Sequence, residues 1–170
     1  MIDALRVEIL ASRHQRIDFS CGVAALDRYF HQLVTQDIRR RLSNCFVAID
    51  PVGAIVGYYT FAAAGIPLTE LPPELARRLP RYPSIPAALI GRLAVDRRFH
   101  GEGVGGLLVV DAISRAISAA PAIYALIVEA KDDRALGFYR HLGFQPFIGR
   151  PMTLFLPLAE AAQRLAGPAE

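Results

Sequence analysis

The sequence predicts a mixed α/β fold, in which helices cross over between the strands of a central sheet. Two strand-like segments joined by a Pro/Gly turn predict a hairpin in the first half. The second half alternates apolar, strand-like segments with helical ones, which is the pattern of crossover helices. The chain has 170 residues, 53% of them hydrophobic, which is enough for one sizeable core. We therefore expect a single domain over residues 1–170.

The first half is predicted to contain a strand, a helical region and the hairpin. Apolar residues at helical spacing predict the helix, although its Cys21-Gly22 start offers no strong cap. β-Branched and aromatic residues predict the strands, and Pro51–Gly53 forms the turn. The expected elements are a strand at Leu5–Leu10, a helix at Cys21–Val34, an arginine-rich helix or loop to Leu42, and strands at Asn44–Asp50 and Ala54–Gly65.

The second half begins with a proline-rich segment, Ile66–Pro86, which predicts mostly loop with a short helix around Pro73–Leu79. Asp132 or Asp133 can cap a later helix that stops at Gly143. The remaining elements are strands at Ala87–Val95, Ile123–Ala130, Phe144–Phe147 and Met152–Leu156, with helices at Val104–Ser118, from Asp132 or Asp133 to His141 or Leu142, and at Leu158–Leu165.

Composition excludes several classes of protein. No apolar run approaches the ~20 residues of a membrane span, and the first residues lack the features of a secretion signal, so we expect a cytoplasmic protein. The two cysteines, Cys21 and Cys45, lack the spacing of a zinc site or disulfide framework and are expected to be reduced thiols.

Arginine supplies nearly all of the positive charge, because Lys131 is the sole lysine and the formal net charge is +3. The guanidinium fork of arginine suits phosphate and carboxylate partners. A charge cluster is more often a solvated face than a binding site, but together these clusters permit a polyanionic partner. They lie at Arg39–Arg41, at Arg77, Arg78 and Arg81, and at Arg97 and Arg98 close to Arg92.

The most informative stretch is a glycine-rich loop, Arg98–Gly106, between a buried strand and the start of a helix. Glycines let the backbone approach an anion closely, and the helix N-terminus adds free amides with a partial positive charge. Hydrogen bonds to a charged group contribute about 1.5–3 kcal/mol each, so three or four amides can hold a diphosphate without a metal.

A dinucleotide-binding loop is an alternative, because Gly101, Gly103 and Gly106 also satisfy GxGxxG and Glu129 lies where a ribose-binding acid would be expected. A polar insert, Asp96–His100, nevertheless separates the strand from the glycines. The motif also comes late in the chain, leaving too little sequence for a complete doubly wound sheet.

With Arg98 included, the loop reads Arg-x-x-Gly-x-Gly and follows Gly91–Asp96, and here the sequence resembles the GNAT superfamily of N-acetyltransferases. The resemblance covers about Phe19 to Phe155. It implies a mostly antiparallel, mixed sheet of six to seven strands flanked by helices and splayed at an acetyl-coenzyme A site. It also implies contacts of this co-substrate with the following residues: Leu93, Ala94, Val95, Arg98, Gly101, Gly103, Val104, Gly105, Gly106 and Asp132.

A second motif of the superfamily matches Ala135–Phe144, and the resemblance places Tyr139 beside the thioester sulfur. Tyr139 would otherwise be a core residue, as we expect for Leu136, Phe138 and Leu142. A phenol can protonate the departing thiolate, and the resemblance implies an oxyanion donor among the amides near Ala94–Val95.

Two positions complicate this assignment. Asp132 stands where many members of the superfamily have asparagine, which is a departure from the pattern at a residue expected to contact the coenzyme. No general base is evident, although Glu129 is a candidate. An α-amine with a pKa near 7.7–8.0 needs little help to lose its proton, whereas a lysine amine requires a base to remove it at neutral pH. Aminoacyl esters are therefore chemically easy acceptors.

Further stretches resemble the TacT/AtaT-type toxin acetyltransferases of bacterial toxin–antitoxin systems. They occur in the right order along the chain: Phe19–Val23 with Leu26–Asp27 and Tyr29–Phe30, Gly57–Thr60, Leu79–Pro83 and Ile90–Asp96. This resemblance implies acetylation of the amino acid on charged tRNA, which blocks translation. It also implies a ribbon–helix–helix antitoxin and a homodimer, with Arg92, Arg77, Arg78 and Arg81 as the first candidates for tRNA contacts.

Two other functions stay open. The same core chemistry would serve an enzyme that acetylates a small-molecule amine or a protein N-terminus. A non-catalytic module that binds acetyl-coenzyme A or a partner is the third possibility, although intact Gly101, Gly103 and Tyr139 argue against it.

Overall fold

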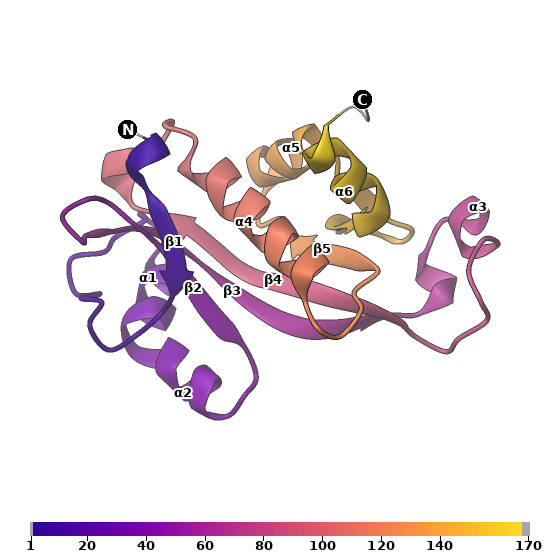
Figure 1. The fold of residues 1–170 in the computed structure, drawn as a ribbon, viewed down its shortest axis with the longest axis horizontal. Helices are drawn as coiled ribbons and strands as arrows, with labels where there is room; N and C mark the ends of the chain where they lie inside the picture. The colour runs from indigo at the N-terminus through magenta and orange to yellow at the C-terminus, as the bar shows by residue number, and fades with distance from the viewer. Residues whose placement is uncertain (1, 168–170) are drawn as a thin grey trace. The chain divides into compact units, whose positions relative to one another are not determined.

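A computed structural model describes residues 2–167, which form the mixed α/β fold shown in Figure 1. The ends of the predicted domain, residues 1 and 168–170, lie outside the described residues. Seven strands form one sheet in the order β1-β2-β3-β4-β5-β7-β6. The bounds of the strands are β1 Arg6–Ile9, β2 Asn44–Ile49, β3 Ile55–Ile66, β4 Ile85–Val95, β5 Ala125–Glu129, β6 Gln145–Phe147 and β7 Arg150–Pro157.

The helices alternate with these strands much as predicted. They are α1 Ala24–Arg28, α2 Val34–Arg39, α3 Pro73–Ala76, α4 Val104–Ser118, α5 Asp133–His141 and α6 Leu158–Ala166. A π-helical turn, η2, spans Tyr29–Leu33, and short 3-10 turns occur at η1 Ile2–Ala4, η3 Leu68–Glu70 and η4 Arg97–Phe99.

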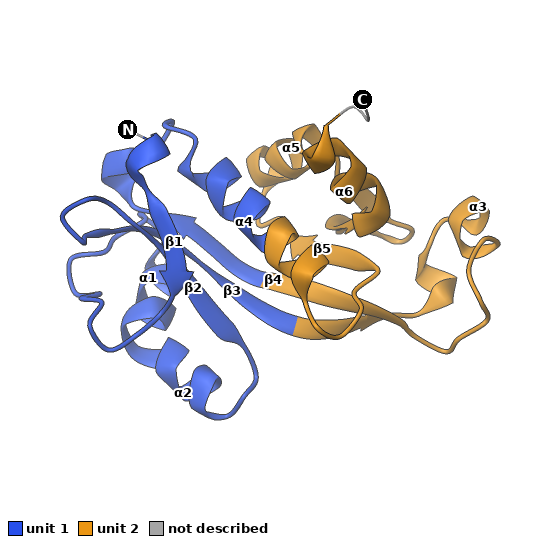
Figure 2. Ribbon diagram, in the orientation of Figure 1, with its two compact units in different colours: residues 1–62, 91–112 blue, residues 63–90, 113–170 orange. Residues whose placement is uncertain are grey.

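The chain forms two compact units, coloured separately in Figure 2. Unit 1 contains Met1–Ala62 and Gly91–Ala112, and unit 2 contains Ala63–Ile90 and Ile113–Glu170. Three elements, β3, β4 and α4, each begin in one unit and end in the other.

In unit 1, antiparallel pairing joins β1 to β2 and β2 to β3, which confirms the predicted hairpin. The core beside these strands is aromatic: the rings of Phe30 and Tyr58 stack with their centroids 4.2 Å apart, and Phe19 packs edge-on against both. All three side chains are almost completely buried. The Tyr58 hydroxyl donates to the carbonyl of Leu26 at 2.8 Å, which satisfies its polar end inside the core.

The first helical region differs from the predicted helix at Cys21–Val34. Helix begins only at Ala24, because Gly22 has a φ of +90° and the Cys21 amide donates to the side chain of Asp27 instead. Helical structure then continues to Arg39 through the π-helical turn η2. Wider turns of this kind change which side chains face inward, and here the consecutive residues Tyr29 and Phe30 are both buried.

In unit 2, β5 pairs in parallel with β4 over Ala87–Ile90 and antiparallel with β7. β7 also pairs antiparallel with β6. β4 starts two residues earlier than the predicted Ala87, at Ile85. The core of this unit is a cluster of buried residues: Ile66, Leu71, Ile85, Ala87, Ala125, Ile127, Phe147 and Phe155.

Gly57 on β3 brings the first turns of α4 close to the strands of unit 1. A methyl group at this position would lie 2.9 Å from Leu108 Cδ1, 3.1 Å from the Ala94 carbonyl oxygen and 3.2 Å from Val104 Cγ1. Leu108 and Val104 are buried, so neither side chain has room to move. The absence of a side chain at Gly57 therefore sets how closely the start of α4 approaches β3 and β4.

We predict that Gly57→Ala lowers the free energy of unfolding by about 1–3 kcal/mol, because it overpacks this region. Chemical denaturation of the purified variant measures the change. The matched control is Gly137→Ala on α5, where an added methyl group meets nothing within 4 Å. That variant should be neutral or more stable by up to about 1 kcal/mol, since alanine favours helix. Equal decreases in both variants would contradict the packing argument.

Candidate functional site

The glycine loop turns the chain from β4 into α4 within unit 1. Gly101 and Gly103 have φ angles of +78° and +84°, in the left-handed region that other residues rarely adopt. The Gly103 carbonyl accepts the first hydrogen bond of the helix, from the Leu107 amide at 3.1 Å. The amides of Val104, Gly105 and Gly106 therefore occupy the first turn, where a helix has no carbonyl of its own to offer them.

Open space lies beside this loop. A methyl group added to Gly101 or Gly106 would meet no neighbouring atom within 4 Å, whereas one at Gly103 would lie 3.2 Å from Ile2 Cδ1. Val104 is buried and anchors the start of the helix. Unhindered amides at the positive end of a helix dipole fit a diphosphate group. The loop thus has the backbone geometry expected from the sequence, and its contact with a diphosphate stays a prediction.

Asp96 fixes the start of the glycine loop through its side chain, and this role was not predicted from the sequence. Its buried carboxylate accepts hydrogen bonds from the amides of Ser20 at 3.2 Å and Arg98 at 3.0 Å. It also forms an ion pair with the Arg98 guanidinium, with Nε at 2.9 Å and Nη2 at 3.2 Å. Burial opposes ionisation, but the bonds from Arg98 and Ser20 outweigh it and lower the pKa of Asp96.

Arg98, a predicted co-substrate contact, therefore directs part of its guanidinium toward Asp96. A second tie comes from His100, whose Nε2 lies 2.8 Å from the carbonyl oxygen of Val95. In the sequence, the ion pair between Asp96 and Arg98 is indicated only by an acidic residue two positions before an arginine. Nothing in the sequence indicates the contact between His100 and Val95.

The strand residues predicted to line the co-substrate lie at the end of β4, in unit 1. Ala94 is buried against Gly57, while Leu93 and Val95 are half-buried. The Asp96 amide donates to the Val56 carbonyl at 2.9 Å, which holds the end of β4 beside β3. The structure thus brings Leu93, Ala94 and Val95 together with the loop.

Tyr139 lies on α5 in unit 2, between the rings of Phe138 and Phe144 at centroid distances of 5.1 and 5.7 Å. Only 6% of the residue is exposed, and burial raises the pKa of Tyr139 to about 12. Among residues 2–167 its hydroxyl has no hydrogen-bond partner. The phenol therefore keeps its proton at neutral pH and is free to donate it.

The ends of α5 match the predicted caps. Asp132 is the N-cap, and its side chain accepts from the Ala135 amide at 2.8 Å. Gly143 follows the helix with a φ of +100°. Asp132 thus has a structural task independent of any coenzyme contact. Glu129, the candidate base, is exposed at the end of β5 and pairs in register with Thr153 of β7.

The predicted tRNA-binding arginines occur in both units. In unit 2, Arg77, Arg78 and Arg81 are exposed immediately after α3. In unit 1, Arg92 is exposed on β4, with its guanidinium carbon 3.6 Å from the centroid of the Tyr29 ring. No signal in the sequence pairs Arg92 with Tyr29.

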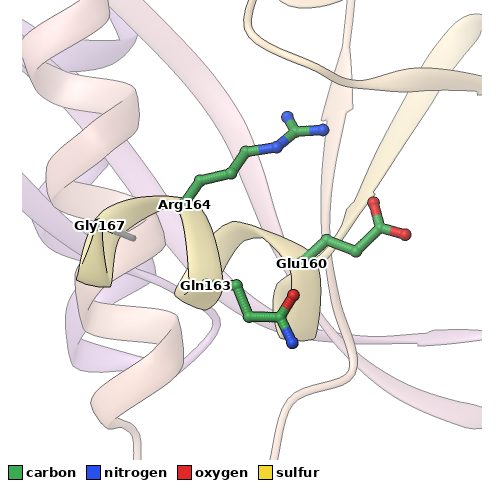
Figure 3. A pocket seen from close by; sticks show the side chains of 4 residues that line it. All are labelled: Glu160, Gln163, Arg164 and Gly167. Carbon is green, nitrogen blue, oxygen red and sulfur yellow. The ribbon is translucent and has the colours of Figure 1, made fainter. Parts of the chain in front are cut away.

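A surface hollow of about 570 Å³ lies along α6 and is lined by none of the predicted site residues. Figure 3 shows the lining side chains of Glu160, Gln163 and Arg164 projecting from that helix, with Gly167 following its last residue. Within residues 2–167, no helix is long and apolar enough to cross a membrane. The same described residues contain no cluster of three or more His, Cys, Asp or Glu able to hold a metal ion.

Comparison with known proteins identifies the family. Residues 41–146 match the model of the acetyltransferase (GNAT) domain, which is more than half of the chain. The chain is 30% identical over 158 residues to "Probable toxin TacT" of Sinorhizobium fredii, covering 87% of each protein. It is 34% identical over 145 residues to the "tRNA-acetylating toxin" of Mycobacterium tuberculosis, covering 84% of this chain and 86% of that protein.

Solved structures give the same result. AtaT complexed with acetyl-methionyl-tRNAfMet superposes with a TM-score of 0.86 at 31% identity, covering 93% of this chain and 97% of that chain. A tyrosine-to-phenylalanine mutant of AtaT, bound to the C-terminus of the antitoxin AtaR and to acetyl-CoA, superposes with a TM-score of 0.79 at 28% identity, covering 98% and 100%. This chain therefore belongs to the GNAT acetyltransferase family and is an N-acetyltransferase.

Proposed function

We propose that this protein transfers the acetyl group of acetyl-coenzyme A to the α-amine of the amino acid on charged tRNA, and so acts as the toxin of a toxin–antitoxin pair. The similarity to AtaT in complex with acetyl-methionyl-tRNAfMet carries the proposal, because it extends over 93% of this chain. The relative described as a tRNA-acetylating toxin supports it independently.

The proposal includes the partners expected from the sequence. They are a ribbon–helix–helix antitoxin and a second copy of the chain, acting in the cytoplasm. The AtaT structure that contains the C-terminus of AtaR supports an antitoxin partner. We also propose that both compact units belong to a single acetyltransferase domain over residues 1–170, since the family model at 41–146 includes residues of each unit.

The co-substrate would be held mainly by main-chain groups. The amides of Gly101, Gly103, Val104, Gly105 and Gly106 would hold its pyrophosphate, and Leu93, Ala94 and Val95 of β4 would contact its pantetheine arm. When bound, acetyl-coenzyme A supplies the acetyl group as a reactive thioester. Arg98 acts chiefly by holding the loop on Asp96, while Asp132 caps α5.

Tyr139 would act as the general acid. Its hydroxyl holds a proton up to about pH 12, and this proton would pass to the sulfur as the C–S bond of the thioester breaks, so that a neutral thiol leaves. The proton that the attacking amine loses as it becomes an amide would restore the phenol. The acceptor then needs no strong base, because an α-amine loses its proton near pH 7.7–8.0. This chemistry therefore suits aminoacyl esters better than the ammonium group of lysine, whether or not Glu129 acts as a base.

We expect Tyr139→Phe to lower the rate of acetyl transfer by about 100-fold or more, which is the usual contribution of a positioned acid. The assay incubates the protein with labelled acetyl-coenzyme A and a total pool of charged tRNA, and counts label in the tRNA fraction. Label should require the attached amino acid, so deacylated tRNA is the negative control.

The fold of the Tyr139→Phe variant should survive, since the ring contacts with Phe138 and Phe144 remain. Its affinity for acetyl-coenzyme A should equal that of the wild type. Wild-type transfer to small amines or protein N-termini, with none to charged tRNA, would contradict the proposed substrate. Full activity of the variant would remove Tyr139 from the mechanism.

The exposed arginines after α3 are expected to contact tRNA phosphates. Changing Arg77, Arg78 and Arg81 together to glutamine should weaken tRNA binding and reduce the slope of log K against log salt by about 2, because each neutralised phosphate contributes roughly 0.7–0.9 to that slope. Fluorescence anisotropy over a salt series measures the slope.

The control for this variant changes Arg39, Arg40 and Arg41 to glutamine, which removes the same charge from the exposed end of α2 and the turn that follows. If both triple variants weaken binding equally, the effect is one of net charge. If neither changes the slope, the arginines after α3 do not contact tRNA.

A further inference from the structure

Arg92 is an exposed arginine whose conformation is held at both ends by buried side chains of unit 1. Its main-chain amide donates to the hydroxyl of Thr60 at 3.0 Å. Its guanidinium lies over the Tyr29 ring, 3.6 Å from the centroid. Thr60 and Tyr29 are 2% and 3% exposed, so both supports belong to the core.

The Tyr29 ring is itself held in place. Its hydroxyl donates to Asp37 on α2 at 2.7 Å, and burial together with this bond raises the pKa of Tyr29 to about 12. The phenol therefore stays neutral and keeps its bond to the carboxylate. The π-helical turn η2 places Tyr29 at this position, because it turns both Tyr29 and Phe30 into the core.

The stack leaves the hydrogen-bonding edge of Arg92 available. A cation–π contact covers one face of the guanidinium, whereas the N–H donors lie around its edge. No carboxylate among residues 2–167 lies within ion-pair distance of this group. An exposed guanidinium that is oriented but not neutralised is prepared for an external anion.

We propose that Tyr29, braced by Asp37, is a positioning residue that orients Arg92 toward a phosphate of the acceptor tRNA. The identity of the ligand, tRNA, rests on the proposed function. The positioning role of Tyr29 rests on its contact with Arg92. Because an ordered side chain gives up less conformational entropy on binding, the stack would raise affinity without adding a contact of its own.

A double-mutant cycle tests this coupling. The variants are Tyr29→Leu, Arg92→Ala and the combination, and the probe is tRNA carrying an N-acetylated amino acid, followed by fluorescence anisotropy. Arg92→Ala and Tyr29→Leu should each weaken binding about 3- to 10-fold, the size expected when a cation–π interaction is removed. The double variant should bind no more weakly than Arg92→Ala alone.

Two conservative variants separate positioning from folding. Tyr29→Phe keeps the ring but removes the hydrogen bond to Asp37. Its affinity for tRNA should lie between those of the wild type and Tyr29→Leu. Tyr58→Phe is the matched control, because it also removes a buried hydroxyl, but one that donates to Leu26. It should leave tRNA affinity unchanged. In all variants, the KM for acetyl-coenzyme A should stay at the wild-type value.

Additive effects in the cycle would overturn the inference, since Tyr29 would then support the fold and not Arg92. A decrease in affinity in Tyr58→Phe as large as that in Tyr29→Phe would overturn it for the same reason. If the wild type acetylates charged tRNA normally but the effects of the two substitutions on tRNA affinity are additive, only this inference fails and the proposed function stays intact. Coupled binding without acetylation overturns the proposed function alone, and absence of tRNA binding by the wild type overturns both.

Discussion

The buried carboxylate of Asp96 is the interaction on which the geometry of the glycine loop depends. It connects the segment before α1, through the Ser20 amide, to the amide and guanidinium of Arg98. A buried charge is costly unless its oxygens are satisfied, and here both oxygens accept bonds from groups in the segments that they join. Folding of the N-terminal segment and placement of the loop are therefore coupled through one side chain.

Tyr139 and Tyr29, to which we assign a catalytic and a positioning role by proposal, show how two tyrosines differ in their surroundings. Burial raises the pKa of both Tyr139 and Tyr29 to about 12. Tyr29 donates its hydroxyl proton to Asp37 in a hydrogen bond and presents its ring face to an arginine. Tyr139 is packed between aromatic rings, and its hydroxyl has no partner among the described residues. Tyr29 can therefore position an arginine, whereas Tyr139 has a hydroxyl proton that it can donate.

Much of this architecture could be predicted from local signals in the sequence. The bounds of α4 agree with the prediction, because a run of glycines precedes an uninterrupted helical pattern. The Asp132 cap, the Gly143 stop and the β2–β3 hairpin follow from equally local rules. By contrast, the π-helical turn and the late start of α1 depend on a bond between Cys21 and Asp27 and on aromatic packing, which no spacing rule contains.

The site was predictable to a similar extent. Gly101, Gly103 and Tyr139 stand in recognisable motifs, and the loop and helix that carry them have the expected form. The contacts of Asp96 with Ser20 and of Arg92 with Tyr29 could not be predicted, because each joins residues from distant parts of the chain. Ser20 and Asp96 are separated by 76 positions, and only the fold brings them together.

A loop that binds through main-chain amides has an unusual mutational profile. Every residue except proline carries the same amide, so no single side chain can be deleted to remove the donors at Gly101–Gly106. Weaker binding would come from added atoms: a side chain at Gly101 or Gly103 would strain the backbone, and one at Gly106 would project into open space beside the loop. Screens that replace residues with alanine would thus find sensitive positions among the smallest residues of the loop and at Arg98, which is bonded to Asp96, and a comparatively tolerant one at the exposed Glu102.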